Sequence, residues 1–331
     1  MARFAVAGAT SWGLTLAWLA EGNGHSVTVI CRTQHEADAV RARRGIERLP
    51  ELKLRDATEV VPAPASGEFD GFIVAVPAQS VRLTVAGCGV GTGTPVLAAA
   101  KGIELATGNL VSDVLGGLGW HADRIAALSG PNLAHEIVRG LPAAAVIAST
   151  SRAEAERWQS VLSRPAFRTY TSDDLTGVQL GGAYKNVIAI AAGACWGLQF
   201  GANAVATVMT RGLAEMTRLG LVMGAETSTF LGLAGVGDLA TTCFSPLSRN
   251  RRFGELLAQG RSVAEAKASI GEAIEGAATA EIALALARQH GVELPICAEV
   301  AAMPSPLKPL VPVPAIVWIL FGGAASTMRM R

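Results

Sequence analysis

The chain has 331 residues, with 28 lysines and arginines against 27 aspartates and glutamates. At ~150 residues per domain this length predicts two domains, and an apolar fraction of 50% excludes a disordered chain. The balanced charge excludes the broad positive surface that duplex nucleic acid requires, so no nucleic-acid partner is expected. Five cysteines without a CxxC pair or a cluster with the histidines favour reduced thiols, a cytoplasmic location and no bound metal.

The first 150 residues predict a sheet that is buried on both faces. Short, uniformly apolar runs bounded mostly by Gly, Pro or Asn are the expected strands: residues 4–7, 26–31, 72–76, 95–100, 125–129 and 143–149. Runs without alternation are typical of a mostly parallel sheet with helices on either side. We therefore predict an α/β domain over residues 1–175.

The rest of the chain predicts helices. Long helical patterns cover residues 177–192, 204–223 and 277–290, and they define an all-α domain over residues 176–303. A proline-rich tail follows over residues 304–331, and its prolines exclude a regular helix at its start. We expect this tail to be extended and loosely packed.

The uncharged stretch 186–210 raises the alternative of a membrane span. Gly193, Gly197 and Gly201 have the small-xxx-small spacing of membrane helices. The stretch also holds Asn and Gln side chains, which are costly in lipid without partners. We favour a buried helix pair and no membrane span.

The segment Gly8-Ala-Thr10-Ser11-Trp12-Gly13 directly follows the first predicted strand. It has the spacing of a dinucleotide-binding fingerprint, in which backbone N–H groups at a helix start approach a pyrophosphate. Thr10 places a side chain in the middle position, at the point of approach. An ordinary strand, turn and helix therefore stays the alternative.

Arg32 follows the second predicted strand, where an NAD site usually offers Asp or Glu to the ribose. Arginine can instead accommodate a 2′-phosphate, so we expect NADP(H) to be preferred, with NAD(H) also usable. The alternative is a solvated surface charge. Glu36 lies nearby, but its offset suits the following helix better.

Two polar segments follow neighbouring predicted strands. Lys101 comes after the strand 95–100, and Gly130-Pro131-Asn132 comes after the strand 125–129. Ligands of open parallel sheets bind along the edge formed by the carboxyl ends of the strands. We expect both segments to face one ligand, although each alone could be an ordinary loop.

Lys185 is the only ionised side chain in its helical stretch. A lysine with so little polar company is either paired or has a lowered pKa, and both favour proton transfer. It is our candidate general acid or base. The alternative is a lysine whose head group reaches the surface.

A glycine-rich segment ends at Asp238, and a basic cluster follows it. Ser248 is expected to cap a helix whose first turn holds Arg249 and Asn250, so that hydroxyl, guanidinium, amide and helix dipole converge on a phosphate. Arg251 and Arg252 are expected to face solvent.

With these motifs, residues 3–302 resemble the bacterial NAD(P)-dependent glycerol-3-phosphate dehydrogenases. The stretches that carry the resemblance are Leu128-Ser-Gly-Pro-Asn-Leu-Ala-His-Glu-Ile, Gly177-Val-Gln-Leu-Gly-Gly-Ala-Tyr-Lys-Asn-Val-Ile-Ala-Ile, Thr210-Arg-Gly-Leu-Ala-Glu-Met, Gly232-Leu-Ala-Gly-Val-Gly-Asp-Leu and Ser248-Arg-Asn-Arg. The resemblance implies a Rossmann-type domain followed by a helical domain. It also implies reduction of dihydroxyacetone phosphate to sn-glycerol 3-phosphate for phospholipid synthesis.

The resemblance also implies roles for individual residues. Lys185 matches the proton-transfer lysine. The implied substrate-binding positions are Lys101, Gly130, Asn132, Lys185, Asp238, Ser248, Arg249 and Asn250. The implied cofactor-binding positions are Gly8, Thr10, Ser11, Trp12, Gly13, Arg32, Lys101, Ala134, Arg249, Ala273 and Glu275.

Thr10, Asn132 and the proline-rich end depart from the family pattern, in which a glycine and a Ser or Thr stand at the first two places. Two alternatives remain open: a related two-domain dehydrogenase acting on a 3-hydroxy acid, and a catalytically weakened NADP-binding protein. A homodimer is also open.

Overall fold

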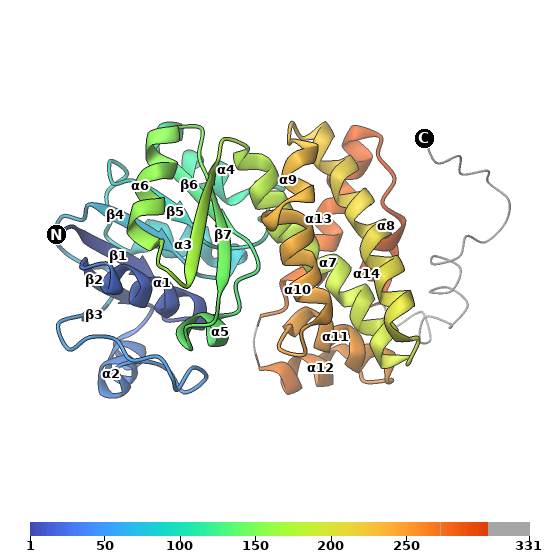
Figure 1. Cartoon of the computed structure of the whole chain (residues 1–331), viewed down its shortest axis with the longest axis horizontal. Helices are drawn as coiled ribbons and strands as arrows, with labels where there is room; N and C mark the ends of the chain where they lie inside the picture. The colour runs from blue at the N-terminus through green and yellow to red at the C-terminus, as the bar shows by residue number, and fades with distance from the viewer. Residues whose placement is uncertain (272, 304–331) are drawn as a thin grey trace, which may run out of the picture. The chain divides into compact units, whose positions relative to one another are not determined.

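The computed structural model describes residues 1–271 and 273–303, so the extended tail expected over residues 304–331 lies outside the described residues. The chain forms two compact units (Figure 1). The first comprises Met1–Ala183 and Gly220–Asp238, and the second comprises Tyr184–Leu219 and the described residues from Leu239 onward.

An eight-stranded sheet forms the centre of the first unit, in the order β3-β2-β1-β4-β5-β6-β7-β8. Its strands are β1 (Arg3–Ala7), β2 (Ser26–Cys31), β3 (Glu59–Pro62), β4 (Gly71–Val74), β5 (Val96–Ala98), β6 (Ile125–Ser129), β7 (Ala143–Ala148) and β8 (Phe167–Ser172). Neighbouring strands pair in parallel except β6 and β7, which are antiparallel. The mostly parallel sheet and its six expected strands are confirmed.

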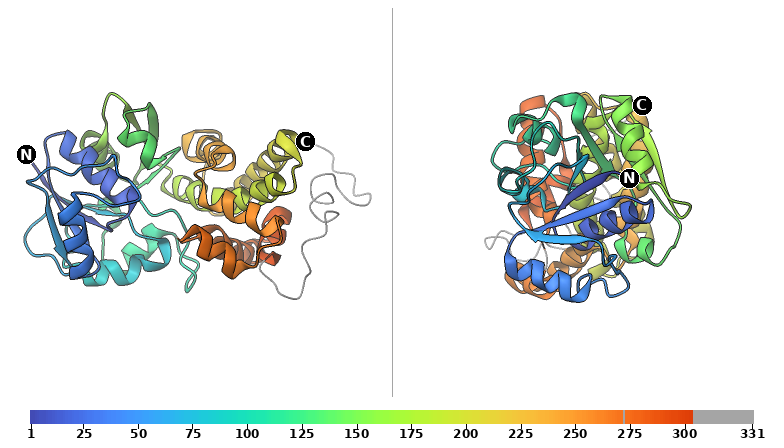
Figure 2. Two further views of the ribbon diagram at one scale, coloured as in Figure 1. Left: turned by 90° about the horizontal axis from the view of Figure 1, so that it is seen from below. Right: turned by 90° about the vertical axis from the view of Figure 1, so that its left-hand side faces the viewer.

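Helices cover both faces of this sheet (Figure 2). Phe4 and Val6 of β1 belong to a core with one group of helices, and Ala5 and Ala7 belong to a core with another. The first group is α1 (Ser11–Gly22), α2 (Gln34–Arg43), α5 (Ala134–Val138) and α6 (Arg152–Leu162), and the second is α3 (Val81–Gly87) and α4 (Val111–Gly117). Burial on two sides explains why the strand sequences are uniformly apolar.

The strands β3 and β8 are absent from the sequence-based prediction. Both lie at the edges of the sheet. β8 has the sequence Phe-Arg-Thr-Tyr-Thr-Ser, in which buried Phe167 and Thr169 alternate with exposed Arg168 and Tyr170. One face of β8 is therefore exposed, and the continuous apolar run that predicts a buried strand is missing.

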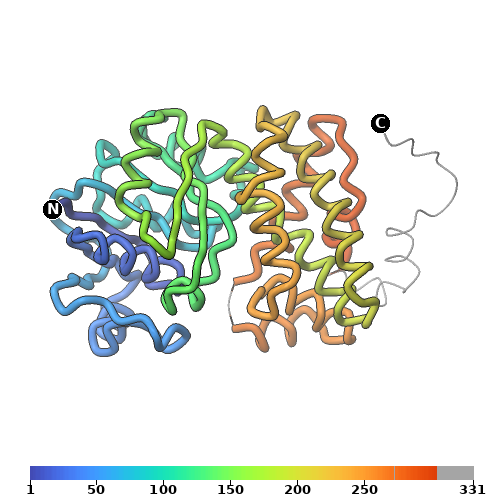
Figure 3. Tube along the Cα trace, in the orientation of Figure 1, coloured from blue at the N-terminus to red at the C-terminus, as the bar shows by residue number. Residues whose placement is uncertain are grey.

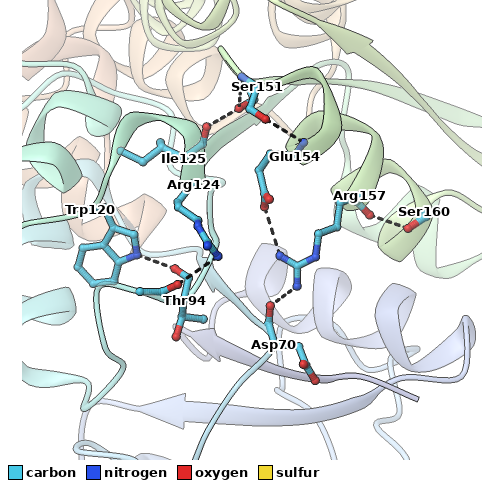
Figure 4. A network of polar contacts seen from close by, with 11 residues as sticks. Asp70, Thr94, Trp120, Arg124, Ile125, Ser151, Glu154, Arg157 and Ser160 are labelled. Carbon is cyan, nitrogen blue, oxygen red and sulfur yellow. Dashed lines mark hydrogen bonds and ion pairs between the residues drawn. The ribbon is translucent and has the colours of Figure 1, made fainter.

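Polar contacts hold the segments that precede the central strands β4 and β5 (Figure 4). Arg157 of α6 donates to the backbone oxygen of Asp70, just before β4, and lies 3.4 Å from the Glu154 carboxylate. The indole N–H of Trp120 donates to the backbone oxygen of Thr94, just before β5, at 2.8 Å. Burial raises the pKa of Glu154. These contacts lie at the amino-terminal ends of β4 and β5.

Two long helices, α7 (Leu175–Gly197) and α8 (Gly201–Val222), account for the uncharged stretch (Figure 3). They are separated by a short break in which Gln199 has a positive φ of 59°. No helix among the described residues is long and apolar enough to span a membrane. The other helices that contribute to the second unit are α10 (Asp238–Phe244), α11 (Arg249–Ala258), α12 (Val263–Ile270), α13 (Glu275–His290) and α14 (Pro295–Ala302).

The buried carboxylate of Glu215 in α8 connects three elements of the second unit. It accepts hydrogen bonds from the backbone N–H of Ile296 at 2.7 Å and of Cys297 at 3.2 Å, at the start of α14. The Tyr184 hydroxyl of α7 donates to it at 3.1 Å. Burial raises the pKa of Glu215 in spite of these donors.

All five cysteines are buried and free of disulfides. Burial raises the pKa of the thiols of Cys31 and Cys297 to about 12 and that of Cys195 to about 11. These three thiols therefore stay protonated at neutral pH, which makes them poor nucleophiles.

Candidate functional site

The fingerprint turn lies where β1 meets its two neighbours in the sheet. Gly8 follows β1 with a φ of +112°, and a Cβ there would lie 2.7 Å from the backbone oxygen of Ala75. Gly13 lies in the first turn of α1, where a Cβ would be 2.1 Å from the Gly8 oxygen. Both glycines are therefore required for the tight strand-to-helix turn, as the fingerprint predicts.

Thr10 caps α1. Its hydroxyl accepts a hydrogen bond from the Gly13 N–H and donates to the Ala75 backbone oxygen, each at 2.9 Å. The first N–H groups of a helix have no intrahelical acceptor, so Thr10 satisfies one of them, and those of Ser11 and Trp12 remain at the helix end. The Thr10 side chain, which was expected at the point of pyrophosphate approach, instead forms hydrogen bonds within the turn.

Arg32 lies directly after β2 and is exposed. Its backbone N–H donates to the Glu36 carboxylate at 2.7 Å, while the Thr33 hydroxyl caps α2 by accepting from the Glu36 N–H. Glu36 is therefore in the first turn of the following helix, as its offset predicts. The Arg32 side chain is exposed at the carboxyl end of β2.

Lys101 and Asp238 form a largely buried ion pair in the first unit. The Lys101 ammonium lies 2.7 Å from the Asp238 carboxylate and donates to the Gly130 backbone oxygen at 2.9 Å. The Ser129 hydroxyl donates to the same carboxylate oxygen of Asp238 at 3.4 Å. Lys101, Gly130 and Asp238, which are far apart in the sequence, thus meet at the carboxyl ends of β5 and β6.

Asn132 follows this cluster and has an unusual environment. Its amide nitrogen and oxygen are both buried, and neither has a hydrogen-bond partner. Buried amides are nearly always paired in folded proteins, and Asn132 shares this lack of a partner with the Trp158 indole N–H and a few other buried groups. Ala134, two residues later, is the first residue of α5.

Lys185 lies in α7 and is only 7% exposed. Its ammonium donates to the Thr242 hydroxyl of α10 at 3.0 Å. The alternative of a lysine whose head group reaches the surface is therefore wrong. Thr242 has no distinguishing signal in the sequence except that it follows Asp238 by one helical turn.

The starts of α11 and α13 are joined by one side chain. Ser248 caps α11, as predicted, and Arg249 is its exposed first residue. The Asn250 amide oxygen accepts from the Gly276 N–H in the first turn of α13 at 3.1 Å, and its nitrogen donates to the Asn186 side chain at 2.9 Å. Two helix N-termini are therefore fixed together, which favours binding of an anion.

The remaining predicted residues lie around this junction. Ala273 and Glu275 lie on either side of Ile274, the residue that precedes α13, and Glu275 begins the helix. Arg252 is exposed as expected. The expectation that Arg251 faces solvent is wrong, because its guanidinium lies over the Trp196 ring at 5.0 Å and pairs with Glu255 at 2.7 Å.

Within the described parts of the chain, no group of three or more His, Cys, Asp or Glu side chains is placed to hold a metal ion.

Comparisons with known proteins cover both halves of the chain. Residues 3–155 match the family model described as NAD-dependent glycerol-3-phosphate dehydrogenase N-terminus. Residues 174–306 match the model described as NAD-dependent glycerol-3-phosphate dehydrogenase C-terminus.

Relatives and solved structures agree with these matches. The glycerol-3-phosphate dehydrogenase (NAD(P)+) of Streptomyces avermitilis is 43% identical, with 98% of each chain covered. That of Thermobifida fusca is 43% identical, with 92% of each chain covered. The crystal structure of glycerol-3-phosphate dehydrogenase from Coxiella burnetii has a TM-score of 0.85 and 31% identity, and the match covers 97% of this chain and 99% of that one.

Proposed function

Because the chain belongs to the NAD-dependent glycerol-3-phosphate dehydrogenase family, we propose that it catalyses the reversible, NAD(P)H-dependent reduction of dihydroxyacetone phosphate to sn-glycerol 3-phosphate. It is an oxidoreductase whose product supplies glycerophospholipid synthesis. The observation that carries the chemistry is the buried Lys185 ammonium, held by Thr242 in the same unit as the joined starts of α11 and α13.

The residues of the first unit fit a dinucleotide. The Gly8 turn leaves no room for a Cβ, and the N-terminus of α1 presents the N–H groups of Ser11 and Trp12. Arg32 at the end of β2 would hold a 2′-phosphate, which favours NADP(H) over NAD(H). Gly13, Lys101 and Ala134 are further proposed cofactor contacts in the first unit. In the second unit, the same role is proposed for Arg249, Ala273 and Glu275. When bound, the reduced nicotinamide supplies the hydride for C2 of the substrate.

The proton comes from Lys185. As the C2 carbonyl gains the hydride, its oxygen becomes negative, and the Lys185 ammonium gives that oxygen its proton, so the product carries a hydroxyl at C2. Thr242 holds the ammonium in place before the transfer. Positioned proton transfer of this kind contributes ~10²- to 10⁴-fold to a rate.

The phosphate is bound at the start of α11. There Ser248, Arg249 and Asn250 combine a hydroxyl, a guanidinium and an amide with the positive end of the helix dipole. Lys101, Gly130, Asn132 and Asp238 of the first unit are further proposed substrate-binding residues. This phosphate site favours the triose phosphate over an unphosphorylated 3-hydroxy acid.

NADPH oxidation in the presence of dihydroxyacetone phosphate tests the proposal, with NADH in a parallel assay. Turnover of an unphosphorylated 3-hydroxy acid but not of the triose phosphate would support the related dehydrogenase. NADPH binding, measured by its fluorescence, without turnover would support a weakened nucleotide-binding protein.

Two further properties belong to the proposal. Five buried, free thiols support a reducing compartment, so we place the protein in the cytoplasm. A homodimer stays a prediction, which light scattering on the purified protein can test. The near-neutral formal charge of +1 supports the absence of a nucleic-acid partner.

A further inference from the structure

The segment that carries Lys101 is held by side chains outside the proposed site. This segment, residues 101–110, connects β5 to α4 and has no helix or strand of its own. Gln79, in the short 3-10 helix η1 (Ala78–Ser80), contacts it with both ends of its amide. The nitrogen donates to the Ile103 backbone oxygen at 2.7 Å, and the oxygen accepts from the Leu105 N–H at 2.9 Å.

An ion pair fixes the same segment at a second point. The Arg82 guanidinium of α3 donates Nε and Nη2 to the two carboxylate oxygens of Glu104, each at 2.8 Å. Two parallel bonds of this kind define direction as well as distance. The Glu104 side chain is 8% exposed and also accepts a bond from the Thr107 hydroxyl at 2.7 Å. The Arg82 guanidinium holds the pKa of Glu104 below its usual value.

The segment that carries Gln79 and Arg82 also contacts the fingerprint turn. Gln79 and Arg82 follow β4, after Ala75 and Val76. The Thr10 hydroxyl donates to the Ala75 backbone oxygen at 2.9 Å, and a Cβ on Gly8 would lie 2.8 Å from a methyl carbon of Val76. The segment after β4 therefore contacts the fingerprint turn at one end and the Lys101 segment at the other.

We propose that Gln79, Arg82 and Glu104 are positioning residues that fix the Lys101 ammonium for substrate binding. Glu104 is three residues from Lys101 and touches neither Gly130 nor Asp238, so its effect passes through the backbone of the segment. The inference rests on the proposed function, in which Lys101 binds the substrate.

Glu104→Gln removes the negative charge that pairs with Arg82 and keeps the size of the side chain. We expect the KM for dihydroxyacetone phosphate to rise roughly tenfold, the scale of one hydrogen bond to a charged group, with a smaller change in kcat. NADPH affinity, measured by fluorescence, should change no more than it does in Lys101→Met. Arg82→Lys keeps the charge without the bidentate geometry and should give an intermediate KM.

The matched control is Glu156→Gln. It breaks an Arg–Glu pair of the same 2.8 Å length between Arg152 and Glu156 on α6, where both side chains are largely exposed. KM and kcat of this variant should equal those of the wild type.

A double variant separates positioning from general stability. If Glu104 acts through Lys101, Glu104→Gln should not raise KM further in a Lys101→Met background. An equal rise in both backgrounds, or a wild-type KM for Glu104→Gln alone, overturns the positioning role. A wild-type protein that does not reduce dihydroxyacetone phosphate overturns the proposed function, and the inference with it.

Discussion

The Asn250 side chain accepts a hydrogen bond from the backbone N–H of Gly276 and so ties the first turn of α11 to the first turn of α13. A Cβ on Gly276 would lie 2.5 Å from the Asn186 backbone oxygen and 2.8 Å from the Asn250 amide oxygen. Close approach of three elements is therefore possible only with glycine at this position.

Gly276→Ala is expected to separate the two helix starts. We predict a loss of stability of about 1–3 kcal/mol, typical of an overpacked site, and a higher KM for dihydroxyacetone phosphate. Gly116→Ala is the control, because a Cβ there meets open space on α4. Wild-type KM and stability for Gly276→Ala would show that the junction does not shape the phosphate site.

Lys185→Met is expected to leave NADPH affinity intact and to reduce kcat by roughly 10²- to 10⁴-fold. Methionine keeps an apolar chain in the buried position but cannot donate a proton. Lys267→Met, at an exposed lysine of α12, is the control. Turnover close to that of the wild type would remove Lys185 from the mechanism.

Thr10→Val should destabilise the protein by about 1 kcal/mol, because the helix cap is lost while the side-chain volume is kept. Thr10→Ser keeps the hydroxyl and should be close to neutral. Urea unfolding measures both variants. Tighter NADPH binding by Thr10→Val would contradict the view that the hydroxyl serves the turn without obstructing the nucleotide.

Arg32→Ala should weaken NADPH binding by roughly tenfold or more, since a hydrogen bond to a charged group contributes about 1.5–3 kcal/mol, and should leave NADH binding unchanged. Arg43→Ala, at an exposed arginine at the end of α2, serves for comparison. Fluorescence titrations with both nucleotides measure the ratio. An equal loss for NADH and NADPH would argue against 2′-phosphate recognition.

Glu215 predicts a dependence of stability on pH. Burial raises its pKa in the folded protein above the ~4.3 of an unfolded chain. The folded state therefore keeps the proton to higher pH, and this contribution to stability falls as the pH rises from ~4.3 through the raised pKa. Glu215→Gln does not titrate, so the free energy of unfolding of the wild type should decline relative to the variant across that window. A constant difference in urea unfolding would be inconsistent with the raised pKa.

The sequence predicted the sheet and the helices because their signals are local. Strands buried on both faces are continuous apolar runs, whereas the edge strand β8 is half exposed and was not predicted. The fingerprint spacing located Gly8 and Gly13, but the direction of the Thr10 hydroxyl depends on the Ala75 oxygen, which is distant in the sequence.

The candidate site was predictable as a set of residue types and not as a set of contacts. The burial of Lys185 followed from its apolar neighbours, but its Thr242 partner comes from another helix. Arg251 was expected in solvent because it follows Asn250 in the same helix turn, yet the Trp196 ring offers it a packing surface. Such pairings depend on how the helices pack against one another. The sequence pattern of a single helix holds no information about that packing.

The five buried cysteine thiols can be used to measure local opening of the folded chain. Cys31 and Cys88 belong to the first unit, and Cys195, Cys243 and Cys297 belong to the second. A thiol reagent can modify each one only when its surroundings open, so labelling rates compared between the two groups measure how often each unit opens under native conditions. Mass spectrometry of labelled peptides would then show which unit a bound nucleotide or triose phosphate protects, with no engineered probe.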